Sequence, residues 1–554
     1  MQPVDLAAAA VTVERGSAEG QWLTWLERIS ADGPSTDPEA LEIWGYTDQP
    51  SYAPGETVGL HVSTSAPIWG FEVWRDGHTF EKVHEQRGLA GAHHPVGDDV
   101  VASGCGWPQG ASFEIPTGWA SGGYIVVLRG ERDGQEVTQD AFFVLRAAEP
   151  GRGSKLAMVA ATYTWQEYND WGGGCGYFSD EYVDHTADPL EVREKSFKPR
   201  LSFDRPWSRG LIRTPVGVPR LAQPPPPVGA AVGIPAADWA ISNGYSVWTV
   251  AAGWARYDAL TFRWLEANGY EPELLSQWDL DRDPTVLDGY RAVVTTGHDE
   301  YWSAGGRAVL DQFIEGGGRY ARLGGNIVWQ VRMEDGLHTQ VCHKYAAHAD
   351  PEHQSDDIDR RTGAFEAHYI DRPPVTTFGA NGFRGVYSRM GGLSPRGAGG
   401  FIVYRPGHWA FDGADVYYGD VLGSDLPVVG YETDGVAYTF RHGLPYPTGD
   451  DGAPEGLEIL ALTPVTLEEE DHGQAGNLIS IADGDLAFAA EALFGEDTPE
   501  ARDRIRYGSA VITAMAKGSG EVFCAGTTEW CHALAQGDIQ VEAITRNVLN
   551  RFLD

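Results

Sequence analysis

Residues 290–296, YRAVVTT, run directly into residues 297–303, GHDEYWS, and this junction indicates the architecture of the chain. The first run is short, apolar and rich in β-branched residues, as in an interior strand of a parallel sheet. A helical pattern over 257–267 precedes it and another over 303–314 follows it. Strands alternating with helices predict a parallel sheet connected by crossover helices.

The same rhythm extends over residues 155–554. Apolar runs at 156–161, 320–323 and 520–526 predict further strands, and the pattern over 541–552 predicts a closing helix. Between about 333 and 484, short β segments and Gly/Pro-rich turns interrupt the rhythm. We interpret this stretch as a β-rich insertion in an α/β domain.

The N-terminal part has a different pattern. Over residues 41–147, short apolar segments of period two alternate with turns, which predicts an antiparallel β-sandwich. Residues 148–154 predict a linker, and residues 1–40 an N-terminal arm. The expected fold class is therefore multidomain, all-β followed by α/β.

Charge and composition exclude several classes of partner. The 554 residues include 41 Lys and Arg against 79 Asp and Glu, a net charge of −38, which repels nucleic acid and anionic lipid. There is no apolar run long enough to cross a bilayer and no secretion signal. The five cysteines are scattered without a CxxC pair, which favours reduced thiols in the cytoplasm.

The strongest candidate for chemistry is the GHDEYWS segment. In an open α/β sheet, functional groups gather beyond the carboxyl ends of the strands, and His298 follows such an end. Ser303 is a plausible N-cap, whose helix would favour anions. The alternative, that these side chains only cap a turn, stays open. No GxSxG, HExxH or P-loop motif is present.

This segment, together with others, resembles the large (beta) subunit of N,N-dimethylformamidase and its relatives. The shared motifs are spread over most of residues 41–554, so the resemblance is not confined to one site. They include YNDWGG at 168–173, SFDRP at 202–206, WLEANGY at 264–270, GYE at 430–432 and AGTTEW at 525–530.

The resemblance implies an amidohydrolase. Its known member has a single ferric iron held by two tyrosines and a glutamate, hard oxygen donors that suit this ion. We therefore expect iron-dependent hydrolysis of the C–N bond of a small amide, such as a formamide, to a carboxylic acid and an amine. The resemblance also implies a glutamine-amidotransferase-like or flavodoxin-like α/β domain, a small partner subunit and a homo-oligomer.

Carried over position by position, the resemblance implies specific residues. Tyr257 and Tyr301 match the two tyrosine ligands, and Glu366 is chosen as the carboxylate ligand. Glu458 is a candidate catalytic carboxylate, and His298 is expected to orient water or the leaving group. The carboxylate position stays open, with Glu334 and Glu352 as alternatives and His368 as an alternate ligand.

Two other readings remain. The chain could be a non-catalytic binding or structural protein built on a β-sandwich and a degenerate amidotransferase-like domain. A weaker reading is a glycan-active enzyme that uses the carboxylates at 468–470, although that run is typical of a solvated loop. Colour from tyrosinate-to-iron charge transfer would distinguish the iron enzyme from the non-catalytic protein.

Overall fold

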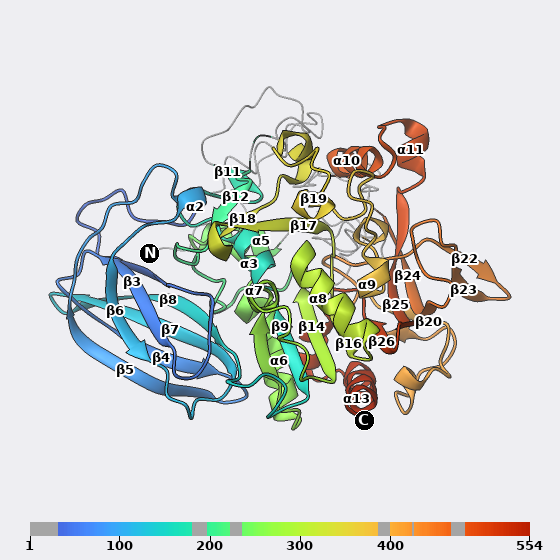
Figure 1. Cartoon of the computed structure of the whole chain (residues 1–554), viewed down its shortest axis with the longest axis horizontal. Coiled ribbons are helices and arrows are strands. Elements are labelled where there is room, and N and C mark those ends of the chain that lie inside the picture. The colour runs from blue at the N-terminus through green and yellow to red at the C-terminus, as the bar shows by residue number, and fades with distance from the viewer. Residues whose placement is uncertain are drawn as a thin grey trace.

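The computed structural model describes residues 31–179, 195, 197–221, 235–385, 399–423, 426–466 and 482–554. Most of the predicted N-terminal arm, residues 1–30, and the carboxylates at 468–470 lie outside the described residues. The described chain forms a multidomain α/β plus β fold, with the β-rich part coloured blue in Figure 1.

The N-terminal part holds two sheets that share a core. One contains β1 (Ile43–Thr47), β3 (Thr57–Thr64) and β6 (Gln109–Glu114); the other contains β2 (Ser51–Tyr52), β8 (Gln135–Leu145), β7 (Gly122–Arg132), β4 (Ile68–Asp76) and β5 (Phe80–Ala90). Leu60 of β3, Phe71 of β4 and Phe143 of β8 belong to one buried cluster, which therefore draws on both sheets. Alternating apolar residues therefore produce the strands predicted over 41–147.

A nine-stranded sheet forms the centre of the C-terminal part. Its strands, in spatial order, are β13 (Glu273–Ser276), β9 (Leu156–Ala160), β14 (Ala292–His298), β16 (Arg319–Gly325), β26 (Gly520–Cys524), β25 (Tyr507–Lys517), β24 (Glu458–Thr466), β20 (Phe401–Val403) and β21 (Val421–Leu422). The first five pair in parallel, which confirms the predicted parallel sheet. The remaining strands extend it in antiparallel fashion.

Helices cover this sheet where the sequence places them. The predicted helices correspond to α6 (Ala259–Ala267), α8 (Ala304–Glu315) and α13 (Ile539–Leu553). Ser303 caps α8, because its side chain accepts a hydrogen bond from the Gly306 amide at 2.9 Å. A π-helical turn, η3 (Trp254–Asp258), precedes α6.

The stretch expected to be a β-rich insertion, about 333–484, contributes strands to the central sheet. Its strands β20 and β24 pair with each other, and β24 pairs with β25, so this stretch extends the central sheet. A smaller sheet contains β12 (Arg200–Ser202), β18 (Thr339–Val341), β17 (Trp329–Glu334) and β15 (Tyr301–Ser303), with β19 (Gly363–Ala364) paired to β17.

Short elements complete the described fold. The helices are α2 (Val100–Ser103), α3 (Thr162–Tyr168), α5 (Pro235–Ser242), α7 (Gln277–Arg282), α9 (Val375–Phe378), α10 (Ala482–Phe494), α11 (Pro499–Asp503) and α12 (Trp530–Gln536). The single turns are η2 (Trp248–Val250), η4 (Asp335–Leu337), η5 (Lys344–Ala349), η6 (Ile358–Arg360), η7 (Gly382–Arg384) and η8 (Trp409–Phe411). Two hairpins consist of β10 (Gly174–Cys175) with β11 (Phe178–Ser179), and of β22 (Tyr438–Arg441) with β23 (Leu444–Pro447).

In the described part of the chain, no helix has the length and apolarity needed to cross a membrane. All five cysteines are free thiols.

Candidate active site

His298 ends β14, at the carboxyl edge of the parallel sheet, and is fully buried. Its Nδ1 lies 2.7 Å from the carbonyl oxygen of Ala251, so Nδ1 carries a proton and donates it. The other nitrogen, Nε2, lies 2.8 Å from a carboxylate oxygen of Glu432 and 3.2 Å from one of Glu300. The backbone carbonyl therefore fixes the imidazole so that Nε2 faces two acids.

Glu300 is the centre of a cluster of phenols. The Tyr177 hydroxyl donates to Glu300 at 2.8 Å, and the Tyr168 hydroxyl does so at 3.2 Å. The Trp329 indole donates to the same carboxylate at 2.7 Å. The Tyr301 hydroxyl lies 2.5 Å from that of Tyr177, so one carboxylate and three phenol oxygens form a continuous polar chain.

Burial is the main control on these phenols. It raises the pKa of Tyr168, Tyr177 and Tyr301 well above the usual value, and the nearby charge of Glu300 raises each further. With protein groups alone, the phenols are therefore neutral. A cation among them would reverse this preference, because it stabilises phenolate.

A buried lysine supports the same tyrosines. The Lys344 ammonium lies 3.4 Å from the ring centre of Tyr177 and 4.8 Å from that of Tyr301. It pairs with Glu167 at 2.9 Å and donates to the Gly176 carbonyl at 2.7 Å. Since Glu167 neutralises it, Lys344 orients the rings without cancelling the charge of Glu300.

His298 and Glu432 form a buried acid–base pair. Burial lowers the pKa of His298, but Glu432 and Glu300 outweigh this and raise it to about 10. Burial likewise raises the pKa of Glu432, against the lowering effect of His298. Asn326 hydrogen-bonds to Glu432, and its amide nitrogen lies 3.2 Å from His298 Nε2, so one amide contacts both members of the pair.

An ionic clamp holds the loops that carry these residues. Arg322, with 0% of its side chain exposed, contacts the carboxylate of Asp434 and donates to the carbonyl oxygen of Asp299 at 3.0 Å. Asp434 also accepts the Ile327 amide at 2.9 Å. One guanidinium thus joins the segments that contain His298, Asn326 and Glu432.

The two predicted tyrosine ligands occupy different surroundings. Tyr301 belongs to the Glu300 cluster, whereas Tyr257 packs edge-on against His298, with ring centres 6.0 Å apart. Among the described residues, no contact joins Tyr257 to Tyr301. Their convergence on one ion stays a prediction, and the described contacts do not support it.

The predicted carboxylates lie outside the cluster. Glu366 accepts the Phe383 amide at 2.9 Å, and no described contact joins it to Glu300 or Tyr301. Glu458 is solvent-exposed at the first residue of β24, level with Val294 in the register. Four strand spacings separate β24 from β14, or about 19 Å, so Glu458 cannot contact His298. The open alternatives are also engaged elsewhere: Glu334 pairs with Arg200, Glu352 with Arg360, and His368 is exposed.

The Glu300 cluster suits a hard metal ion. Its carboxylate and phenol oxygens, which hydrogen-bond to one another at 2.8 and 3.2 Å, are hard donors that would hold such an ion once the phenols lose their protons. Within the described ranges, no three His, Cys, Asp or Glu side chains form a metal-binding group. The Glu300 cluster would not be counted as one, because its other oxygen donors are tyrosines.

Of the residues predicted from sequence, His298 and Tyr301 lie beside Glu300, whereas several of the residues around them had no predicted role. Tyr168 and Glu432 stand in the motifs YNDWGG and GYE that carried the resemblance, so a signal was present without an assigned role. Glu300 was passed over in favour of a downstream carboxylate. Tyr177 lies in the turn of the β10–β11 hairpin and Lys344 begins η5, and only the tertiary fold brings Tyr177 to Glu300 and Lys344 to Tyr177.

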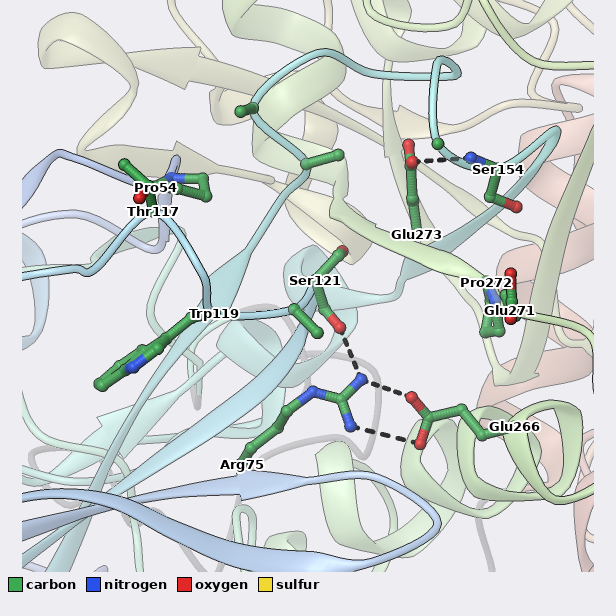
Figure 2. A pocket seen from close by; sticks show the side chains of 14 residues that line it. Pro54, Arg75, Thr117, Trp119, Ser121, Ser154, Glu266, Glu271, Pro272 and Glu273 are labelled. Carbon is green, nitrogen blue, oxygen red and sulfur yellow. Dashed lines mark hydrogen bonds and ion pairs between the residues drawn. The ribbon is translucent and has the colours of Figure 1, made fainter.

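A separate pocket of about 550 Å³ lies between the N-terminal sheets and the α/β part. Figure 2 shows Arg75 between Ser121 and Glu266, and Glu273 beside Ser154. The carboxylates of Glu266 and Glu273 are already paired or hydrogen-bonded there, and none of the predicted site residues lines this pocket. We therefore interpret this pocket as part of the contact between the N-terminal sheets and the α/β part, and not as the active site.

Fold and site together define a protein with a buried oxygen-donor centre at the carboxyl edge of an α/β sheet. The C-terminal model of the N,N-dimethylformamidase beta subunit-like family matches residues 70–543, and the chain belongs to this family. The N,N-dimethylformamidase beta subunit of an Alcaligenes species is 24% identical over an alignment of 533 residues that covers 88% of this chain. The chain spans 59% of the length of that relative.

Two solved structures of a β-glucuronidase from Parabacteroides merdae, one with glycerol in its active site, were also matched. They share 9% and 10% identity over 51% of this chain and 33% of the enzyme, with a TM-score of 0.13. A likeness this low is not evidence for a common fold.

Proposed function

We propose that the protein is an amidohydrolase that cleaves the C–N bond of a small amide, such as a formamide, with water. The observation that carries the proposal is the convergence of Glu300 and its phenols with the His298–Glu432 pair, because His298 Nε2 faces both carboxylates. Membership of the N,N-dimethylformamidase beta subunit-like family supports the same reaction class.

We further propose a single ferric ion, with Glu300 and two of the phenols of Tyr168, Tyr177 and Tyr301 as its donors. When bound, such an ion would polarise the amide carbonyl and lower the pKa of a bound water. The hard oxygen donors favour iron in this oxidation state. Charge supports a cation here: among the described residues, the ion pairs of the carboxylates of Glu167, Glu300 and Glu432 are with Lys344 and His298, three acids against two basic groups.

The protein groups supply the proton transfers that hydrolysis requires. Attack by water releases a proton, and departure of the amine consumes one. His298 Nε2 and a carboxylate oxygen of Glu432 lie 2.8 Å apart. Glu432 can take the proton of water, protonated His298 can give its Nε2 proton to the amine nitrogen, and a proton passed from Glu432 to His298 restores the pair. The Ala251 carbonyl keeps Nδ1 protonated, so Nε2 is the nitrogen that exchanges protons.

The finer assignments follow from the family. We propose that the N-terminal sheets form a sandwich, that the α/β part is glutamine-amidotransferase-like, and that the enzyme is a cytoplasmic homo-oligomer. The name of the relative, a beta subunit, supports a small partner subunit.

The test is amine release from formamides by the purified protein and its His298→Gln and Glu432→Gln variants. General acid–base catalysis contributes roughly 10² to 10⁴ in rate, so we expect each variant to lose at least a hundredfold in kcat. The exposed Glu458→Gln variant is the matched control and should retain full kcat. A wild-type protein that releases no amine, or variants with unchanged kcat, would overturn the proposal.

A further inference from the structure

Tyr257 forms a second side of the His298 environment, away from Glu300. Its ring lies edge-on to His298, at 6.0 Å, and to His532, at 5.5 Å. It comes from η3, and His532 comes from α12. Gly297, at φ 65°, permits this approach, since a Cβ there would lie 2.3 Å from that of Tyr257.

Both side chains are buried with an unpartnered polar atom. Tyr257 is 1% exposed and His532 is 8% exposed. In the described structure, neither the Tyr257 hydroxyl nor His532 Nε2 has a hydrogen-bond partner. Buried polar atoms are rarely left unpaired, because each costs about 1–3 kcal/mol. Two such atoms on touching rings beside His298 point to a bound molecule that satisfies both.

The two groups are uncharged, which defines the chemistry of that molecule. Burial raises the pKa of Tyr257 well above its usual value. Burial, Arg220 and Arg256 lower the pKa of His532 well below its usual value. A phenol can donate or accept, and a neutral imidazole nitrogen does one or the other. For either tautomer, the pair offers one donor and one acceptor.

We propose that Tyr257 and His532 bind the amide group of an uncharged substrate that keeps at least one N–H, a primary or N-monosubstituted amide. The carbonyl oxygen of the amide accepts a hydrogen bond from the donor of the pair, and the amide N–H donates one to its acceptor. An N,N-disubstituted amide would leave the acceptor unpaired. The inference rests on the proposed amidohydrolase function and specifies its substrate.

The experiment compares kcat and KM for formamide, N-methylformamide and N,N-dimethylformamide. An unpaired acceptor costs about 1–3 kcal/mol, so we expect the wild type to prefer the two N–H amides by roughly 5- to 150-fold in kcat/KM. Tyr257→Phe and His532→Gln should each raise KM for those amides at least fivefold. They should raise KM for N,N-dimethylformamide by a smaller factor, because that amide uses only the donor of the pair.

Tyr320→Phe is the matched control, because the Tyr320 hydroxyl is buried but hydrogen-bonded to Thr295 at 2.6 Å. It should leave substrate preference unchanged. Equal kcat/KM for all three amides, or a Tyr257→Phe variant that behaves like Tyr320→Phe, would overturn the inference while leaving amide hydrolysis intact. If the wild type hydrolyses no amide, the proposed function fails. The subsite is then tested by binding alone, as the rise in melting temperature that acetamide causes. A rise that is as large in Tyr257→Phe as in the wild type would reject the subsite as well.

Discussion

At the scale of single residues, the buried Glu300 and the half-buried Glu366 have opposite surroundings. Glu300 accepts hydrogen bonds from two phenols and an indole and lies 3.2 Å from His298, so it sits in a site rich in donors. Glu366 accepts one backbone amide, and burial raises its pKa to about 8. The first carboxylate is suited to bind a cation, and the second is suited to remain protonated inside the fold.

The raised pKa of Glu366 predicts a pH effect on stability. Between about pH 4.3, the unfolded value, and about pH 8, the folded carboxyl keeps a proton that the unfolded chain releases. The contribution of this carboxyl to the free energy of unfolding is therefore fully present below its pKa in the unfolded chain. It is lost as the pH rises through its pKa in the folded protein. Urea unfolding at pH 5 and pH 8 should show that Glu366→Gln loses less stability over this range than the wild type. Parallel losses would contradict the raised pKa.

At the scale of elements, α8 depends on its first residues. Ser303 closes the GHDEYWS segment, and its side chain accepts the Gly306 amide at 2.9 Å. An N-cap serine contributes about 1 kcal/mol, so Ser303→Ala should lower the free energy of unfolding by that amount. The exposed Ser103→Ala, whose hydroxyl only donates to the Asp99 carbonyl, is a control that should lose less. Equal losses would show that the cap is not the cause.

The clamp around Arg322 is a second element-scale feature. Removing one partner of a buried ion pair leaves the other charge uncompensated, which costs about 3–5 kcal/mol. Arg322→Met should therefore destabilise the protein by about that amount, because Asp434 and Asp299 lose their cation. Chemical denaturation measures this.

Arg307 provides the comparison for the clamp. It is also buried but donates mainly to backbone carbonyls and threonine hydroxyls. Arg307→Met should lower stability without changing kcat, whereas Arg322→Met should lower both. An Arg322→Met protein with unchanged kcat would show that the clamp does not position His298 and Glu432.

At the scale of the whole molecule, Asp76 connects the N-terminal sheets to the α/β part. It ends β4 and is 1% exposed. It accepts hydrogen bonds from Arg263 at 2.8 and 2.7 Å and from the Trp254 indole at 2.8 Å. We expect Asp76→Ala to cost about 2–4 kcal/mol and to separate thermal unfolding into two transitions. Calorimetry tests this, and a single unshifted transition would contradict it.

The periodic parts of the fold were predictable from sequence, and the site was predictable only in part. Runs such as 290–296 have a local pattern, and a buried parallel strand needs little else. His298 stands out in the sequence because it follows such a strand, and Tyr301 because it lies in a motif of the family resemblance. Tyr177 and Lys344 have no periodic context, and Glu432 lies more than a hundred residues from His298. Their meeting depends on tertiary packing, which no local signal encodes.

The central claim concerns the ion at Glu300, and iron content with the visible spectrum tests it most directly. Wild-type protein should contain about one iron per chain and show a tyrosinate-to-iron absorption band, while Glu300→Gln should lose both. Glu366→Gln, a change of the same kind at a carboxylate outside the cluster, should keep them. Colourless, iron-free wild-type protein, or a Glu300→Gln variant that retains the full band, would contradict the account.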